Sequence, residues 1–291
     1  MLRRFRTPAL AVVLSALALT PLGGNPTGLP SLPSFLGFSG KIRAIFALPH
    51  ENPVKDLGKG VPDKPGVYSL AGSLPAFERL SLIILKPFTE KIDDRIGQYR
   101  LGFWPYERRA AENPRYANPR GFIEVTPENF ATQVSEHFTL GEFVTHDQQN
   151  VWPKYVVLDQ RLLDKLELTI AELSSRGIPV SDLHVMSGFR TPQYNEKGVG
   201  AGGRSSVSRH QYGDAADVYP DSDRNGRMDD LNRDGRVDLT DARVLADAAD
   251  AVERANPELS GGVGLYPANS AHGPMVHIDA RGKRARWTYG G

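Results

Sequence analysis

Four residues in the C-terminal half of the chain have the types and spacing of a metal site. His210 and Asp217 flank Gly213, which permits a tight turn between them, and His and Asp are both good ligands for first-row metals. His277 and Asp279 lie in an apolar run that predicts a strand, so alternation puts both on one face. Two His and one carboxylate, with one position open to water, form the donor set of a catalytic zinc site. One zinc ion in such a site lowers the pKa of water to about 7 and polarises carbonyl groups.

Spacing alone leaves a plainer explanation open, because it also fits a loop histidine whose ring nitrogens are satisfied by hydrogen bonds. Three segments in this order along the chain favour the metal site: SGFRTPQYN at 187–195, SRHQYGDAAD at 208–217 and VHID at 276–279. Together they resemble the zinc D-alanyl-D-alanine carboxypeptidase family. The chain is most similar to the branch of periplasmic murein endopeptidases whose last segment reads GGVGxYP, then VHxD, then RxW. Here that segment reads GGVGLYP at 261–267, then VHID at 276–279, then Arg286-Trp287 with no residue between the two.

The resemblance covers residues 126–291 and implies roles for five of them. It implies that His210, Asp217 and His277 hold zinc and that Arg190 binds the carbonyl or carboxylate near the scissile peptide bond. A guanidinium suits that role because it is a rigid and permanently charged donor; a structural ion pair is the alternative. Ser208 is expected to orient the loop or a ligand, with an ordinary turn serine as the alternative.

The chain departs from the family at the general base. Many members carry an acidic residue three positions before the last zinc histidine, and others carry a histidine two before it, where this chain has Pro274 and Met275. His272 lies in a longer loop just upstream and is the candidate for proton transfer or for stabilising an oxyanion. Asp279 is expected to be either a hydrogen-bond partner of His277 or the base itself.

An acidic insert at 221–241 predicts one calcium ion, with a second as a weaker prediction. One stretch fits the calcium loop of EF-hand and dockerin type, with Gly235 at its sharp turn and the carbonyl of Arg236 as one ligand. The expected side-chain ligands of this loop are Asp230, Asn232, Asp234, Asp238 and Asp241. A weaker, overlapping loop contains Asp221, Asp223, Asn225 and Asp229. Calcium there would brace the segment after Asp217; a solvated acidic turn is the alternative.

The elements that must position these residues are typical of an α+β fold. Apolar residues at helical spacing predict helices over 158–175 and 241–255, and short apolar runs predict strands over 183–186 and 275–279. Residues 187–217 are rich in Gly, Ser and Arg, which predicts loops between short elements. We therefore expect a small antiparallel sheet with flanking helices that form a zinc cleft.

The N-terminal part predicts export and a second domain. Residues 1–22 have the basic start and apolar stretch of a secretory signal peptide, and 23–60 form a linker rich in Pro and Gly. Residues 61–125 predict a small strand-rich domain before the zinc peptidase domain at 126–291. These features predict a periplasmic or secreted protein with no stable membrane span once the signal is removed; an uncleaved anchor is the alternative.

Composition excludes several classes of function. Lys and Arg total 35 and Asp and Glu total 34, so no basic excess points to nucleic acid as a partner. The chain has no Cys, which excludes disulfides, thiolate metal sites and a cysteine nucleophile. The leading hypothesis is a zinc peptidase that cuts stem peptides or cross-links of peptidoglycan. The alternatives are a non-catalytic wall-binding module stabilised by calcium, favoured by Pro274, and a calcium-dependent adhesion protein, supported only by the acidic insert.

Overall fold

The computed structural model describes residues 42–49, 51, 62, 64–69, 79–108, 113–200 and 203–289. The described residues belong to one compact unit with a mixed α and β composition. The predicted signal peptide at 1–22 and most of the predicted linker lie outside the described residues. The division of the rest at residue 125 stays a prediction.

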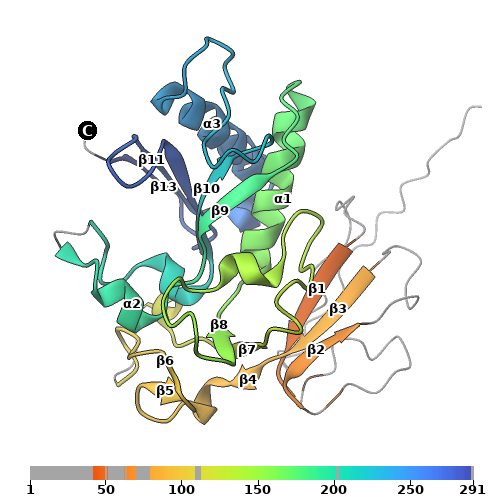
Figure 1. Cartoon of the computed structure of the whole chain (residues 1–291), viewed down its shortest axis with the longest axis vertical. Coiled ribbons are helices and arrows are strands. Elements are labelled where there is room, and N and C mark those ends of the chain that lie inside the picture. Colours follow the sequence, from red (N-terminus) through yellow and green to blue (C-terminus); the bar gives the residue numbers. More distant parts are fainter. Residues whose placement is uncertain are drawn as a thin grey trace, which may run out of the picture. The chain divides into compact units, whose positions relative to one another are not determined.

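A five-stranded sheet, shown in Figure 1, carries two of the three predicted zinc ligands, Asp217 and His277. Its order is β13-β11-β12-β10-β9, and neighbouring strands are antiparallel except for the parallel pair β11 and β13. The predicted strands at 183–186 and 275–279 are therefore present. Within 187–217, where the sequence predicts loops between short elements, β10 begins at Ala215 and carries Asp217. The strands are β9 (Leu183–Ser187), β10 (Ala215–Pro220), β11 (Gly262–Tyr266), β12 (Met275–Asp279) and β13 (Ala285–Thr288).

Two long helices pack against each other and against this sheet. They are α1 (Gln160–Ser175) and α3 (Leu239–Ala255), which confirms the helices predicted at 158–175 and 241–255. Their starts differ by two residues from the prediction because side chains cap them: Asp159 accepts from the backbone of α1, and Asp238 accepts from Thr240 N in a capping box. A third, short helix is α2 (Pro192–Glu196).

Strand alternation decides which face of the sheet holds the site. Val276 and Ile278 of β12 are fully buried in the same core cluster as Leu166 of α1 and Leu245 of α3. Side chains of successive strand residues point to opposite faces, so the side chains of His277 and Asp279 point away from the helices. The helices thus bury one face of the sheet and leave the other for the polar site.

Shorter strands form the rest of the described chain. One three-stranded sheet has the order β1-β3-β2, a second has the order β4-β7-β8, and β5 pairs with β6. Their bounds are β1 (Ile42–Ala47), β2 (Gly66–Ser69), β3 (Arg79–Ile84), β4 (Lys86–Pro87), β5 (Arg95–Ile96), β6 (Tyr99–Arg100), β7 (Gly121–Val125) and β8 (Lys154–Val156). Short 3-10 helices connect the elements: η2 (Phe88–Glu90), η3 (Pro114–Tyr116), η4 (Leu140–Phe143), η6 (Arg209–Tyr212) and η7 (Pro257–Leu259). Within the described ranges, no helix combines the length and the apolar character needed to cross a membrane.

Candidate metal centre

One row of residues across the five-stranded sheet builds the site. Asp217 of β10 pairs with His277 of β12, which pairs with Gly264 of β11, which pairs with Trp287 of β13. On the other side of the row, Asp217 pairs with Ser187 of β9. Side chains directly opposite each other in neighbouring strands lie close together. Pairing of strands far apart in the sequence therefore brings the predicted ligands Asp217 and His277 into contact.

His210 reaches this row from the 3-10 helix η6. Gly213 ends that helix at φ 69°, in the left-handed region that glycine adopts readily. A Cβ at Gly213 would collide with the backbone of Val157, so this turn also requires the close approach that only glycine allows. The tight turn predicted at Gly213 is thus present, and it carries the chain from His210 directly into β10.

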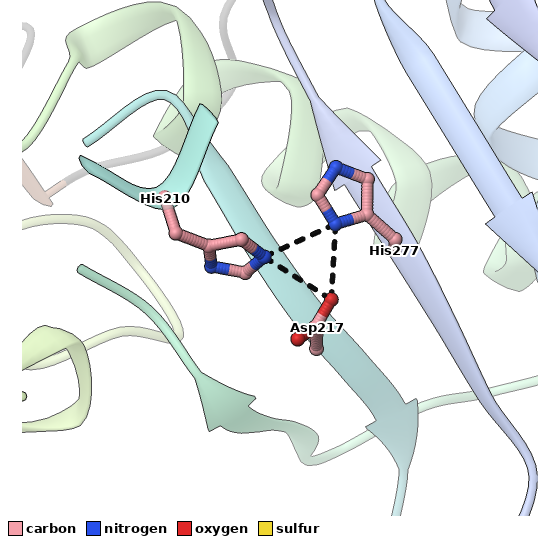
Figure 2. A group of neighbouring side chains, drawn as sticks. All are labelled: His210, Asp217 and His277. Carbon is pink, nitrogen blue, oxygen red and sulfur yellow. Dashed lines mark hydrogen bonds and ion pairs between the residues drawn. The ribbon is translucent and has the colours of Figure 1, made fainter. Parts of the chain in front are cut away.

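The three predicted zinc ligands converge (Figure 2). His210 Nε2 lies 3.1 Å from His277 Nδ1 and 3.3 Å from Asp217 Oδ1, and His277 Nδ1 lies 3.0 Å from Asp217 Oδ1. All three residues are buried. Zinc with bonds of about 2.0–2.1 Å in tetrahedral geometry requires ligand atoms about 3.3 Å apart. The donor set therefore fits zinc in both chemistry and spacing.

Hydrogen bonds on the far side of each ring fix which nitrogen faces the centre. His210 Nδ1 lies 2.7 Å from the carbonyl oxygen of Gly188, which can only accept, so the hydrogen is on Nδ1. His277 Nε2 lies 3.0 Å from Asp279 Oδ2, which holds a hydrogen on Nε2. In the neutral rings, His210 Nε2 and His277 Nδ1 therefore present lone pairs to each other and to Asp217. Three converging acceptors call for a cation.

The electrostatics of the site favour one positive charge at this point. Burial, followed by the charge of Arg190, lowers the pKa of His210 to about 4, so this ring is neutral at pH 7. Burial acts to lower the pKa of His277 as well, but hydrogen bonds to Asp217 and Asp279 outweigh it and raise this pKa. Burial would raise the pKa of Asp217; the neighbouring His210 and Arg190 hold it well below its usual range. A proton or a metal ion satisfies the same three atoms.

Arg190 lies against the metal ligand Asp217. Its Nη2 forms an ion pair with Asp217 Oδ2, and its Nε donates to Ser187 Oγ at 2.9 Å. The guanidinium thus fixes the carboxylate oxygen that does not face the histidines. This contact is the structural ion pair that was the alternative for Arg190, and the role in substrate binding stays a prediction.

Asp279 is fully buried and its carboxylate is crowded with donors. It accepts from His277 Nε2, from Gly262 N at 2.8 Å and from the backbone and guanidinium of Arg281. Burial alone would raise the pKa of Asp279, but His277 and Arg281 hold it far below its usual range. A carboxylate with so little basicity orients and polarises His277; this favours the role of partner over that of general base.

A buried ion pair lies beneath Asp279 and was not anticipated from the sequence. Lys165 of α1 is fully buried, and its Nζ donates to Asp279 O at 2.6 Å and to Glu253 Oε1 at 2.5 Å. Glu253 of α3 also accepts from Gly261 N at 3.0 Å. Both helices are thereby tied to the backbone of β11 and β12. The sequence signal that could have indicated this ion pair is a lysine on the apolar face of the helix predicted over 158–175.

The GGVG run and Trp287 also shape the site. A Cβ at Gly262 would collide with the Asp279 carboxylate, and a Cβ at Gly264 would collide with the Trp287 indole. The two glycines therefore make room for groups that support His277. The Trp287 and His277 rings lie 5.2 Å apart between centroids, so the indole forms one wall of the centre. The sequence motif contained these residues, but nothing in the pattern revealed their contacts.

Two other predicted residues do not join the group. His272 Nε2 lies 2.8 Å from Asn269 Nδ2, and His272 Nδ1 lies 2.6 Å from Gly273 O, so its partners lie in its own loop. Ser208 precedes η6 as its N-cap, and its side chain makes no capping hydrogen bond. The described contacts place neither side chain against the three ligands, and the roles of both stay predictions.

The acidic insert forms two successive turns with the same internal pattern. In the loop that starts at Asp221, the carboxylate accepts from Asn225 N and Gly226 N, both at 2.9 Å. In the loop that starts at Asp230, the carboxylate accepts from Asp234 N at 3.2 Å and from Gly235 N at 2.8 Å. Both loops therefore hold the turn expected of a calcium loop, with backbone N–H groups as the partners.

The two loops differ in how closely their carboxylates gather. Asp221, Asp223 and Asp229 each offer a ligand atom, and these atoms lie within 4.8 Å of one another. Within the described residues, no such group includes Asp230 or Asp234. In that loop both oxygens of Asp241 accept backbone N–H groups, and Asp238 caps α3. The structure thus gathers carboxylates in the loop that the sequence ranked second.

No protein-family model matches the chain, and searches of curated proteins and of solved structures find no match either. The assignment of a function therefore depends on the sequence motifs and on the geometry of this centre.

Proposed function

We propose that the protein is a zinc-dependent peptidase that hydrolyses peptide bonds in peptidoglycan stem peptides or cross-links. The observation that carries this proposal is the convergence of His210, Asp217 and His277, whose facing atoms lie 3.0–3.3 Å apart. Two neutral imidazoles and a carboxylate, with one tetrahedral position left over, are the donor set of hydrolytic zinc sites.

A zinc ion held by these ligands would lower the pKa of a water molecule and polarise the carbonyl of a bound peptide. The residues of the chain keep the ligands in position for that chemistry. Gly188 O and Asp279 fix the tautomers of the two histidines, and Arg190 fixes Asp217. In the net reaction, water adds to the carbonyl carbon, the C–N bond breaks, and the leaving amine takes up a proton.

The substrate class depends on the resemblance to murein peptidases over residues 126–291. Two features support it: the run from Ser187 to Asn195 leads directly into the site through Arg190, and the GGVG run makes room for groups beside His277. We include in the proposal the export predicted by residues 1–22, since peptidoglycan lies outside the cytoplasm.

A non-catalytic metal module that binds the cell wall is the second candidate. One observation favours it: His272 bonds within its own loop, and Pro274 and Met275 offer no ionisable group. Such a module would bind zinc and would release no peptide.

We also propose that the acidic insert binds calcium, with one ion in the loop from Asp221 and a second in the loop from Asp230. The gathering of Asp221, Asp223 and Asp229 supports the first of these. The insert follows β10 directly, so a bound ion would brace the end of the strand that carries Asp217. Equilibrium dialysis with calcium tests this proposal, and a protein that binds none at millimolar calcium contradicts it.

The decisive experiment for the enzyme uses isolated peptidoglycan sacculi and the exported form of the protein. Metal content is measured first, and released muropeptides are then identified by chromatography and mass spectrometry for the wild type, His210→Ala and His184→Ala. His184 is the matched control, because it is an exposed histidine that contacts the Tyr219 ring at a tilt of 45° and lies outside the metal centre.

We expect new peptide ends with the wild type and with His184→Ala, and none with His210→Ala or after chelation. The new ends identify the bond that is cut. Stoichiometric zinc with no released peptide would exclude the peptidase and favour the wall-binding module. A wild type that binds no zinc would exclude both.

A further inference from the structure

Tyr266 at the end of β11 projects from the same face of the sheet as the metal ligands. It pairs with Met275 of β12, while Gly264, two residues earlier, pairs with His277. Residues two apart in a strand point to the same face. Tyr266 therefore occupies the next row of the sheet, beside the row that holds the centre.

The phenol hydroxyl is hydrogen-bonded to the indole that lies beside the centre. Trp287 Nε1 donates to Tyr266 Oη at 3.1 Å. The indole lies directly over Gly264, since a Cβ there would collide with its Nε1 edge, and the indole ring is 5.2 Å from the His277 ring. Tyr266 Oη is therefore held beside an indole that contacts a metal ligand.

The phenol ring is held in place and keeps its proton. It stacks on Tyr289 with centroids 5.4 Å apart and an angle of 17° between the rings. Burial raises the pKa of Tyr266; the hydrogen bond from Trp287 lowers it in part, and the charge of Asp217 raises it. Because Trp287 donates to the oxygen, the hydroxyl hydrogen of Tyr266 remains available for an acceptor at the site.

Hydrolysis of a peptide bond needs such a donor, because the carbonyl oxygen becomes negative as water adds. Two arginines near the centre, and the predicted donor His272, have partners elsewhere. Arg190 pairs with Asp217 and Ser187, Arg281 pairs with Asp279, and the ring nitrogens of His272 contact its own loop. The Tyr266 hydroxyl is a neutral donor beside the centre with its hydrogen uncommitted.

We propose that Tyr266 is a catalytic residue that donates a hydrogen bond to the carbonyl oxygen of the scissile peptide as that oxygen becomes negative. Tyr266 keeps its proton throughout, so no bond is made or broken at the phenol. Trp287 is the positioning residue, because it holds the oxygen of the phenol. This inference depends on the proposed peptidase function.

The test compares Tyr266→Phe with Tyr289→Phe in the full exported protein. Both changes remove one hydroxyl from the same stacked pair, but Tyr289 is 52% exposed and does not donate to or accept from Trp287 in the described contacts. We expect Tyr266→Phe to lower kcat on a D-alanyl-D-alanine-terminated peptide by about 10²–10³-fold, the usual loss for one oxyanion donor. KM, zinc content and Tm should match the wild type, and Tyr289→Phe should retain full activity.

A binding measurement gives a second readout without turnover. A phosphinate analogue of D-alanyl-D-alanine carries a negative tetrahedral oxygen, and calorimetry gives its Kd for the zinc-loaded protein. We expect Tyr266→Phe to weaken this binding by about 10–100-fold, as for a lost hydrogen bond to a charged group. Trp287→Phe keeps a ring over Gly264 but removes the N–H group, and we expect a smaller loss in both measurements.

The outcomes separate the two proposals. Equal kcat and equal phosphinate affinity for Tyr266→Phe and the wild type would overturn the role of Tyr266 and leave the peptidase intact. A lower zinc content or a lower Tm in Tyr266→Phe would also overturn the catalytic role, because the residue would then be structural. A zinc-loaded wild type that neither hydrolyses peptide nor binds the phosphinate would refute the peptidase itself.

Discussion

The metal centre and the acidic insert are both rich in ligands, yet they are built in opposite ways. The centre joins residues from η6, β10 and β12, and its atoms face one another without a backbone donor between them. The insert is continuous in sequence and largely exposed, and its carboxylates accept N–H groups from their own turns. The first arrangement needs a cation to offset its acceptors; the second is already satisfied in part by hydrogen bonds.

The difference teaches how far a ligand motif predicts a site. A local loop can adopt the turn of a metal site and still leave its carboxylates engaged with backbone N–H groups, as Asp241 does. A site assembled by strand pairing holds its ligands together through the core of the protein, whether or not an ion is bound. We therefore expect changes at the centre to have larger effects than changes in the insert.

The largest effect is expected for Asp217→Ala. The change removes a zinc ligand and leaves the guanidinium of Arg190 without its carboxylate. We expect zinc content to fall to background. The free energy of unfolding should fall by about 3–5 kcal/mol, the usual cost of breaking a buried ion pair. Chemical denaturation and metal analysis measure the two effects.

Asp182→Ala is the matched control for Asp217→Ala. It removes the carboxylate that pairs with Arg224, whose side chain is 80% exposed. We expect the free energy of unfolding to fall by less than about 1 kcal/mol, as for exposed ion pairs, and the zinc content to stay full. Equal effects of the two changes would contradict the contrast between the buried centre and the surface.

The next effect is expected for Asp279→Asn. The change keeps the shape of the side chain but removes the charge that holds the Nε2 hydrogen of His277. We expect zinc affinity to fall by about 10–100-fold, the usual loss when such a supporting carboxylate is removed. Competition with a chelator of known affinity measures it. Asp250→Asn, which affects the partly buried pair with Arg286 and no contact of His277, should leave the affinity unchanged.

Proton release on binding sharpens the comparison further. The pKa of His277 is raised, so in the metal-free centre this ring carries an extra proton at pH 6, whereas His210, with a pKa of about 4, stays neutral. Zinc must displace the proton of His277, so its affinity should fall by about tenfold per pH unit below that pKa. Calorimetry in buffers of different ionisation enthalpy should show about one proton released per zinc. Release of no proton at pH 6 would contradict this account.

The smallest effect is expected for calcium. Binding to the insert would stabilise the fold by RT ln(1 + [Ca²⁺]/Kd), or about 1.4 kcal/mol at ten times the Kd. We expect millimolar calcium to raise Tm by several degrees in the wild type and in Asp234→Ala, and by less in Asp221→Ala. If calcium raises Tm less in Asp234→Ala than in Asp221→Ala, the main calcium site lies in the loop from Asp230.

The local features of the chain could be predicted from its sequence because they depend on neighbouring residues. The apolar spacing of α1 and α3, the strand β12 and the turn at Gly213 all follow from periodicity or from the backbone freedom of glycine. Alternation also placed His277 and Asp279 on one face, and the 3.0 Å contact between them agrees.

Only the tertiary structure decided what these residues do for one another. The pairing of β10 with β12 sets Asp217 against His277, and the pairing of β10 with β9 brings Arg190 close to Asp217. The same folding buries Lys165 under Asp279 and holds Tyr266 through Trp287. Such contacts join residues far apart in the chain, so no periodicity encodes them; register and burial decide them, because a buried polar group must find its partner within the fold.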